Sequence, residues 1–225
     1  MRYYPLLLDM SAAKCLLVGA GEVGCRKLTD LLSTDVESVL VLDIQQPSEK
    51  FSALLKDSRV SFECRPFEEK DVIGMRLVFS AASHGACSAA VLSACKKHGI
   101  PCNIADTPDK SDFIVPARVC RGKITAAIST QGGSPALAKR LRQELETYIE
   151  QKFAALAEVL TRLRPIVLAL QKDSKQNAEL FRSIVYSPLG EALGRRDRQR
   201  CEALLQTLLP PQMHSHIGEL LYELC

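Results

Sequence analysis

The sequence has no apolar run that approaches the roughly 18 consecutive residues a membrane-spanning helix needs. Residues 1–9 are too short, and too soon charged, to form a secretory signal peptide. A transmembrane protein is therefore excluded on pattern. With 225 residues, of which 47% are hydrophobic, we expect a globular protein with a packed core, located in the cytoplasm.

The nine cysteines lack the spacing of metal sites and of redox motifs. There is no C-x-x-C pair and no zinc-ligand pattern, and the number is odd. We expect reduced thiols that serve as small apolar residues, and no bound metal. Their positions are Cys15, Cys25, Cys64, Cys87, Cys95, Cys102, Cys120, Cys201 and Cys225.

The net charge of +3 is unevenly distributed along the chain. Residues 1–112 carry 13 basic and 15 acidic side chains, residues 113–164 carry 9 and 4, and residues 165–225 carry 7 and 7. The basic excess of the middle segment indicates an anionic ligand, with a merely solvated basic helix as the alternative.

Residues 14–43 form the strongest motif in the chain. The apolar strand 14–18 runs into the glycine loop Gly19-Ala20-Gly21-Glu22-Val23-Gly24, a helix with apolar residues at helical spacing follows, and residues 38–43 read as a buried parallel strand. This order of strand, glycine loop, helix and strand predicts a dinucleotide-binding unit.

Each position of the motif has a predicted role. Gly19 permits the tight turn, Gly21 lets the backbone approach a pyrophosphate, and Gly24 lets the helix pack closely on the sheet. Glu22 and Val23 open the helix, whose N-terminus faces the phosphates. Asp43 ends the second strand, where an acid binds ribose hydroxyls and repels a 2′-phosphate, so NAD is favoured over NADP. A solvated strand-end carboxylate is the alternative for Asp43.

The pattern continues as a doubly wound α/β sheet. Strands are expected at 60–64, 76–82 and 101–105, with helices at 47–57 and 86–98, and residues 3–9 read as a short edge strand or a lead-in. The predicted strand order is 3-2-1-4-5, a Rossmann-like sheet. The loops after Val18, Ala82 and Ala105 then meet at one crevice, which brings Ala82 and Asp106 to the cofactor.

The pattern changes at residue 113. Residues 113–119 and 123–129 predict a β-hairpin, and Ser134 followed by Pro135 predicts the start of a helix with Leu137, Leu141 and Leu145 on one face. The rest is helical, with breaks expected near Pro165, Pro188 and Pro210. We therefore divide the chain into a nucleotide-binding domain (1–112), a hairpin and helix that form a dimerisation segment (113–150) and a helical domain (151–225).

Several motifs together resemble the precorrin-2 dehydrogenase family, which includes the N-terminal module of siroheme synthase. They are residues 4–9, the glycine loop with Arg26-Lys27, residues 103–108, residues 111–117 and residues 129–138. The resemblance covers about residues 3–150, and the C-terminal residues match only in being helical.

The resemblance implies that NAD oxidises precorrin-2 to sirohydrochlorin, in an intertwined homodimer. Precorrin-2 is a tetrapyrrole with eight carboxylates, which suits the basic segment. Asp106 corresponds to the family's catalytic aspartate; a turn-forming aspartate before Thr107-Pro108 is the alternative. Some members also insert iron, and the sequence leaves this open. Substrate-binding positions are implied at Ser129, Thr130, Gly132, Gly133, Ser134 and Lys139.

Departures from the family pattern limit what is carried over. Relatives often have a serine where this chain has Thr130 and a glycine where it has Gln131, so regulation through that serine is not expected here. Relatives also often carry acidic residues in place of Ser83-His84-Gly85. The imidazole of His84 is available for proton transfer or metal binding, but a loop histidine without either role is the simpler interpretation.

Two other functional classes compete with a dehydrogenase. An NAD-sensing regulatory domain, as in the ligand-gating domains of potassium transporters, begins with a similar strand and glycine loop, but lacks the hairpin and the helix start at Ser134. A nucleic-acid-binding protein could use the arginines of residues 195–200, but Asp197 interrupts them and no aromatic residues are interleaved. We expect neither a nucleic acid nor a membrane as partner.

Overall fold

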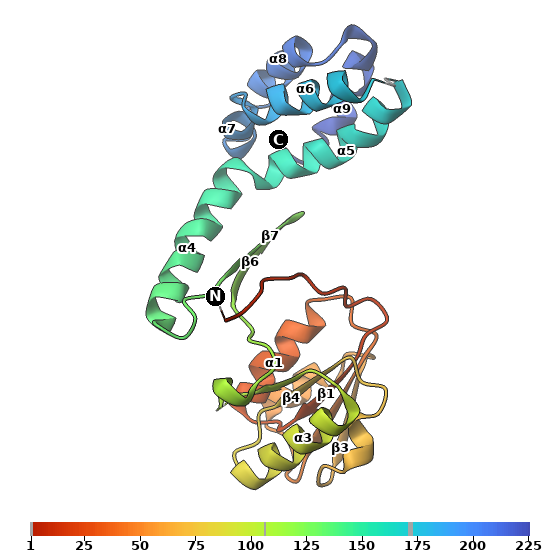
Figure 1. Cartoon of the computed structure of the whole chain (residues 1–225). Helices are drawn as coiled ribbons and strands as arrows, with labels where there is room; N and C mark the ends of the chain where they lie inside the picture. Colours follow the sequence, from red (N-terminus) through yellow and green to blue (C-terminus); the bar gives the residue numbers. More distant parts are fainter. Residues whose placement is uncertain (1, 106, 171–172) are drawn as a thin grey trace. The chain divides into compact units, whose positions relative to one another are not determined.

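The computed structural model describes residues 2–105, 107–170 and 173–225. The chain divides into two compact units, Met1–Val115 and Pro116–Cys225, which are described separately (Figure 1). The boundary lies three residues beyond the predicted end of the nucleotide-binding domain. The separation of a dimerisation segment from a helical domain inside the second unit stays a prediction.

The first unit is a five-stranded parallel sheet in the order β3-β2-β1-β4-β5, as the sequence predicts. Its elements are β1 (Lys14–Val18), α1 (Glu22–Leu32), β2 (Ser38–Asp43), α2 (Glu49–Leu54), β3 (Val60–Cys64), η1 (Glu69–Val72), β4 (Leu77–Ser80), α3 (Gly85–His98), β5 (Cys102–Ile104) and η2 (Pro108–Lys110).

Both faces of the sheet are covered, which is why its central strands are apolar throughout. Leu17 and Phe79 point to the face where α1 and α2 pack, and Leu16 and Val78 point to the face where α3 packs. A strand buried on both faces cannot alternate polar and apolar residues. Fully burying one leucine of this kind stabilises the fold by roughly 1.5–3 kcal/mol.

Two glycines fix the position of α1 against the ends of β1 and β4. Gly19 has a φ of +106°, and an added Cβ atom would lie 2.6 Å from the carbonyl group of Ala81. A Cβ atom on Gly24 would lie 2.0 Å from the carbonyl oxygen of Gly19. Only glycine allows this approach at both positions, which confirms the tight turn at Gly19 and the close packing at Gly24.

The free edge of β5 is closed by the segment that follows η2. The backbone N–H of Asp112 donates to the carbonyl of Cys102, and the N–H of Cys102 donates to Asp112 Oδ2, both at 2.9 Å. The N–H of Ile104 donates to Ser111 Oγ at 2.9 Å. These bonds satisfy edge groups that a short strand would otherwise leave open.

The second unit begins with the predicted hairpin and long helix. β6 and β7 pair antiparallel around a turn at Gly122, and the N–H of Leu137 donates to the N-cap Ser134 Oγ at 3.2 Å. Its elements are β6 (Ala117–Arg121), β7 (Ile124–Ile128), α4 (Pro135–Lys152), α5 (Ala154–Leu170), α6 (Ser174–Val185), α7 (Leu189–Gly194), α8 (Arg198–Leu208), η3 (Pro211–His216) and α9 (Ile217–Leu220).

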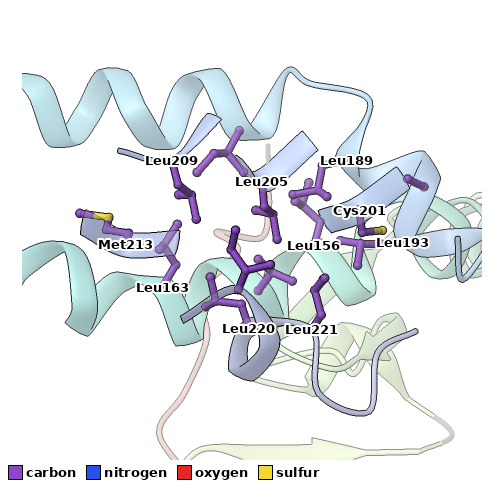
Figure 2. Packing of buried hydrophobic residues seen from close by; sticks show 14 of the residues in the cluster. Leu156, Leu163, Leu189, Leu193, Cys201, Leu205, Leu209, Met213, Leu220 and Leu221 are labelled. Atoms are coloured by element: carbon purple, nitrogen blue, oxygen red, sulfur yellow. The ribbon is translucent and has the colours of Figure 1, made fainter. Parts of the chain in front are cut away.

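The C-terminal helices enclose one apolar core. Figure 2 shows leucine side chains from several helices converging there, with Leu163 of α5 and Leu205 of α8 fully buried. Cys201 is also fully buried in this cluster, so it acts as a small apolar residue, as expected. In the part of the chain that the structure describes, no helix is long and apolar enough to cross a membrane.

One local alternative is decided, and one local prediction was wrong. Residues 3–9 form no strand and Leu6 and Leu7 are exposed, so these residues are the lead-in that the sequence allowed; Ser11, beyond them, makes an isolated bridge to Val36. The expected break near Pro165 is absent, because α5 continues through it to Leu170. Pro165 lies on the exposed side between buried Leu163 and Val167, whose packing outweighs the missing N–H.

Candidate functional site

The glycine loop lies at the carboxyl end of the sheet, between β1 and α1. Gly21 is the N-cap of α1 and supplies no side-chain acceptor to the first turn. Nothing lies within 4 Å of a Cβ atom added to Gly21, whereas Gly19 and Gly24 are closely packed. The open side of the loop and the N-terminus of the helix therefore face the same space, as a pyrophosphate site requires.

Asp43 joins the end of β2 to this loop. Its Oδ2 accepts from the backbone N–H of Ala20 at 2.6 Å, and its Oδ1 accepts from the N–H of Gln45 at 3.0 Å. Asp43 is half-buried and lies where a ribose-binding acid is predicted. Because its carboxylate accepts from Ala20, Asp43 also holds the glycine loop in place. The second of these roles was missed by the sequence analysis, which considered Asp43 only as a ribose ligand or a solvated carboxylate.

The structure brings the predicted cofactor residues of the first unit together. Glu22 and Val23 form the first turn of α1, and Gly19 contacts Ala81 and Ala82 at the end of β4. Ala82 also lines a cavity of about 380 Å³ with Ser88, Leu92, Ile104 and Thr107. The loops after β1 and β4 therefore meet, as predicted from the strand order.

His84 is the N-cap residue of α3 and is exposed. Its Nδ1 lies 3.1 Å from Ser83 Oγ, and its side chain does not cap the helix. The described residues contain no group of three or more His, Cys, Asp or Glu side chains arranged to hold a metal ion. A role for His84 in proton transfer or metal binding gains no support from these contacts.

Asp106, the predicted proton acceptor, lies outside the described residues. Its chain neighbours are described: the N–H of Ala105 donates to the carbonyl of Ser80 at 2.9 Å, and the N–H of Thr107 donates to that of Ile104 at 3.3 Å. The other two acids of this region have structural partners. Asp109 pairs with Arg2 at 2.6 Å, and Asp112 binds the edge of β5, so Asp112 is not a merely solvated carboxylate.

Two further polar residues on the α1 face of the sheet belong to motifs that carry the family resemblance, but the sequence assigned them no role. The ammonium of Lys27 lies 5.7 Å from the centroid of the Phe79 ring, and Asn103 of β5 stands beside Phe79 in register. Asn103 is a polar residue inside a buried strand, a signal that the sequence did offer. Lys27 on a charged helix offered none, because such lysines are usually solvated.

The predicted substrate-binding residues belong to the second unit, in the loop before α4. Thr130 Oγ1 accepts from the N–H of Ser134 at 3.1 Å, and the N–H of Gly133 donates to the carbonyl of Thr130 at 2.9 Å. Gly132, with a φ of +87°, makes the turn possible. Ser129 Oγ accepts from the N–H of Gln131 at 3.1 Å, and Lys139 is exposed on α4. The loop is therefore built by its own hydroxyl groups.

The arginines of residues 195–200 lie at the turn between α7 and α8. Arg196 has a φ of +56°, Arg198 pairs with Glu202 at 2.9 Å, and the N–H of Arg200 donates to the N-cap Asp197 at 3.0 Å. This local pairing favours a solvated helix start over a nucleic-acid-binding surface.

Comparisons with known proteins agree with the fold. Residues 6–117 match a family model described as "Putative NAD(P)-binding". The solved structure of SirC, precorrin-2 dehydrogenase, superimposes with a TM-score of 0.70 at 21% identity, over 89% of this chain and 100% of that one, which shows a common fold.

Several siroheme synthases are among the curated relatives. The protein of Methylococcus capsulatus is 35% identical over 192 residues, which is 85% of this chain and 40% of the relative. That of Nitrosomonas eutropha is 31% identical over 223 residues, or 97% of this chain and 46% of the relative. The chain thus spans less than half the length of these relatives. It belongs to the siroheme synthase family, and its first unit matches the putative NAD(P)-binding model.

Proposed function

We propose that the chain is an NAD-dependent dehydrogenase that oxidises precorrin-2 to sirohydrochlorin in siroheme biosynthesis. The observation that carries the proposal is the glycine loop, open at Gly21, packed at Gly19 and Gly24, and tied to Asp43. Its support from outside the site is the match to siroheme synthases across almost the whole chain. We place the reaction in the cytoplasm, which agrees with nine cysteines that are all free thiols.

Each group of residues has a proposed role in the reaction. The loop and the N-terminus of α1 bind the pyrophosphate, and Asp43 accepts hydrogen bonds from a ribose. Bound NAD would supply the hydride acceptor that the oxidation requires. Asp106, which follows β5 by two residues in the sequence, accepts the proton that precorrin-2 loses and acts as general base. Basic side chains of residues 113–164 attract the carboxylates of the substrate.

An NAD-sensing domain is the alternative from another class. The sensing domains considered above lack a hairpin and a Ser134-type helix start after the nucleotide-binding unit. This chain has both, as β6–β7 and α4.

The proposal predicts that Gly21→Asp abolishes activity without unfolding the chain. Gly21 has an ordinary φ of −77° and nothing within 4 Å of its Cβ position, so the fold accepts a side chain there. The carboxylate would occupy the pyrophosphate site and repel the negatively charged pyrophosphate of NAD. NADH formation from NAD and precorrin-2 under anaerobic conditions, with NAD titration, measures the effect. Normal NAD binding by this variant would show that the loop is not the cofactor site.

Two substitutions of Asp43 separate its two roles. Asp43→Asn keeps an oxygen for the N–H of Ala20 but removes the charge that repels a 2′-phosphate, so discrimination against NADP should fall. Asp43→Ala also releases the Ala20 N–H, and NAD affinity should drop further, by roughly 10- to 100-fold in total. The measurement is the ratio of NAD to NADP dissociation constants. If both variants keep the wild-type ratio, Asp43 does not select the cofactor.

Asp106→Ala should slow the oxidation by about 10²- to 10⁴-fold and leave NAD affinity unchanged, because the ribose and phosphate contacts lie elsewhere. The matched control is Asp109→Asn, which removes a neighbouring exposed carboxylate; Asp112 is unsuitable because it binds β5. Single-turnover NADH formation is the readout. Equal rates of NADH formation in the two variants would show that a group other than Asp106 accepts the proton from precorrin-2.

We also propose a homodimer formed through α4 and the hairpin. Leu137, Leu141 and Tyr148 are 48%, 40% and 50% exposed and share one face of α4, which a second copy could cover. The wild type should sediment at micromolar concentration at about twice 24.8 kDa. A variant with Leu137→Glu and Leu141→Glu should sediment as a monomer, whereas the control Gln143→Glu should not. A wild type that is wholly monomeric contradicts the proposal.

A further inference from the structure

The ammonium of Lys27 is half-buried without a neutralising partner. It lies over the Phe79 ring and makes no ion pair and no hydrogen bond with the residues that the structure describes. Burial lowers the pKa of Lys27 below its ordinary value, partly offset by the negative charge of Asp30. A surface lysine without a binding role ordinarily keeps its ammonium group in water. Its ammonium contacts the Phe79 ring and is available to an acceptor that a ligand supplies.

The oxygen of the Asn103 side chain lacks a donor. Asn103 is 7% exposed, and its Nδ2 donates to the carbonyl of Phe113 at 2.9 Å. That bond fixes the orientation of the amide, because a flip would place two oxygens against each other. Oδ1 is then a buried acceptor, and it has no hydrogen-bond partner among the described residues. Such a group costs free energy until a donor reaches it.

Both groups border the same ring on the same face of the sheet. Asn103 pairs with Phe79 in the register of β4 and β5, and Phe113 packs edge-on against Phe79 with ring centroids 5.5 Å apart. Lys27 reaches the ring from α1 and has four rotatable side-chain bonds, so its ammonium can change position. The chain thus provides one cation and one orphan acceptor beside the Phe79 ring.

The groups around Phe79 lie on the side of the sheet's switch point where the nicotinamide half of NAD is expected. The glycine loop and Asp43 bind the other half. These residues hold the pyrophosphate over β1 and the adenosine on the side of β2. The nicotinamide half then extends over β4 and β5, on the other side of the switch point. Phe79 and Asn103 belong to these two strands.

We propose that Lys27 and Asn103 together bind the carboxamide group of the nicotinamide. The ammonium donates to the carboxamide oxygen, and the carboxamide NH₂ donates to Asn103 Oδ1. A carboxylate of the tetrapyrrole offers acceptors only, so it would leave Oδ1 without a donor and place a negative charge beside it. The inference rests on the proposed use of NAD, and it assigns these two residues the task of fixing which face of the ring meets the substrate.

The test compares NADH with reduced 3-acetylpyridine adenine dinucleotide, in which a methyl group replaces the NH₂. Both reduced rings are uncharged, so repulsion by Lys27 does not confound the comparison. Binding is followed by dinucleotide fluorescence, which is favourable because the chain contains no tryptophan. The wild type should bind NADH roughly 3- to 10-fold more tightly, as one lost hydrogen bond predicts.

Each variant should change one part of this pattern. Asn103→Ala should bind both dinucleotides equally. Lys27→Met should weaken both by a similar factor and keep the preference, while Lys27→Arg should restore part of the affinity. The exposed Lys56→Met removes the same charge elsewhere and should have no effect. Thermal unfolding of each variant separates loss of binding from loss of fold.

Several outcomes would overturn the inference. The first is equal affinity of the wild type for the two dinucleotides. The second is an Asn103→Ala variant that still prefers NADH. The third is a Lys27→Met variant with unchanged affinities for both dinucleotides and a raised KM for precorrin-2. The last would assign Lys27 to a substrate carboxylate. If Asn103→Ala does not fold, the wild-type comparison and the Lys27 variants still decide. If the wild type binds no NADH at all, the proposed function fails before this inference is reached.

Discussion

The close contact of α1 with the end of β1 is the constraint on which the nucleotide-binding unit depends. The position of a Cβ atom on Gly24 lies 2.0 Å from the carbonyl oxygen of Gly19, and that on Gly19 lies 2.6 Å from the carbonyl of Ala81. Because no side chain intervenes, the N-terminus of the helix lies directly at the carboxyl edge of the sheet. The same contact leaves Gly21 open toward the ligand, so packing and binding are set by one loop.

Hydrogen bonds from side chains to backbone groups complete this edge. Asp43 binds the amide of Ala20, and Ser111 and Asp112 bind the amides of Ile104 and Cys102. Each satisfies a backbone donor that the sheet itself leaves open, in the loop after β1 or along the free edge of β5. Groups left unsatisfied, such as Asn103 Oδ1, therefore stand out as places where a ligand can complete the structure.

The second unit combines a buried helical core with an exposed helix face and a polar loop. Its helices bury their own apolar core around residues such as Leu163 and Leu205, while α4 keeps Leu137 and Leu141 exposed. The loop before α4 is stabilised internally by Thr130 and Ser134 rather than by packing. A segment of this kind presents backbone and hydroxyl groups on a fixed frame, which suits binding of a polar ligand.

The sequence alone determined the strand order, the glycine loop and the start of α4, because these follow from local rules. Apolar runs mark buried strands, glycines mark positions without room for a side chain, and Ser134-Pro135 marks a helix start. It could not show that α5 continues through Pro165, that residues 3–9 stay unpaired, or that Asp112 binds β5, since packing between distant segments decides each of these. The second role of Asp43 and the placement of Lys27 and Asn103 beside Phe79 likewise appear only in three dimensions. Burial removes water from those groups, and only the tertiary structure shows which of them are left without a partner.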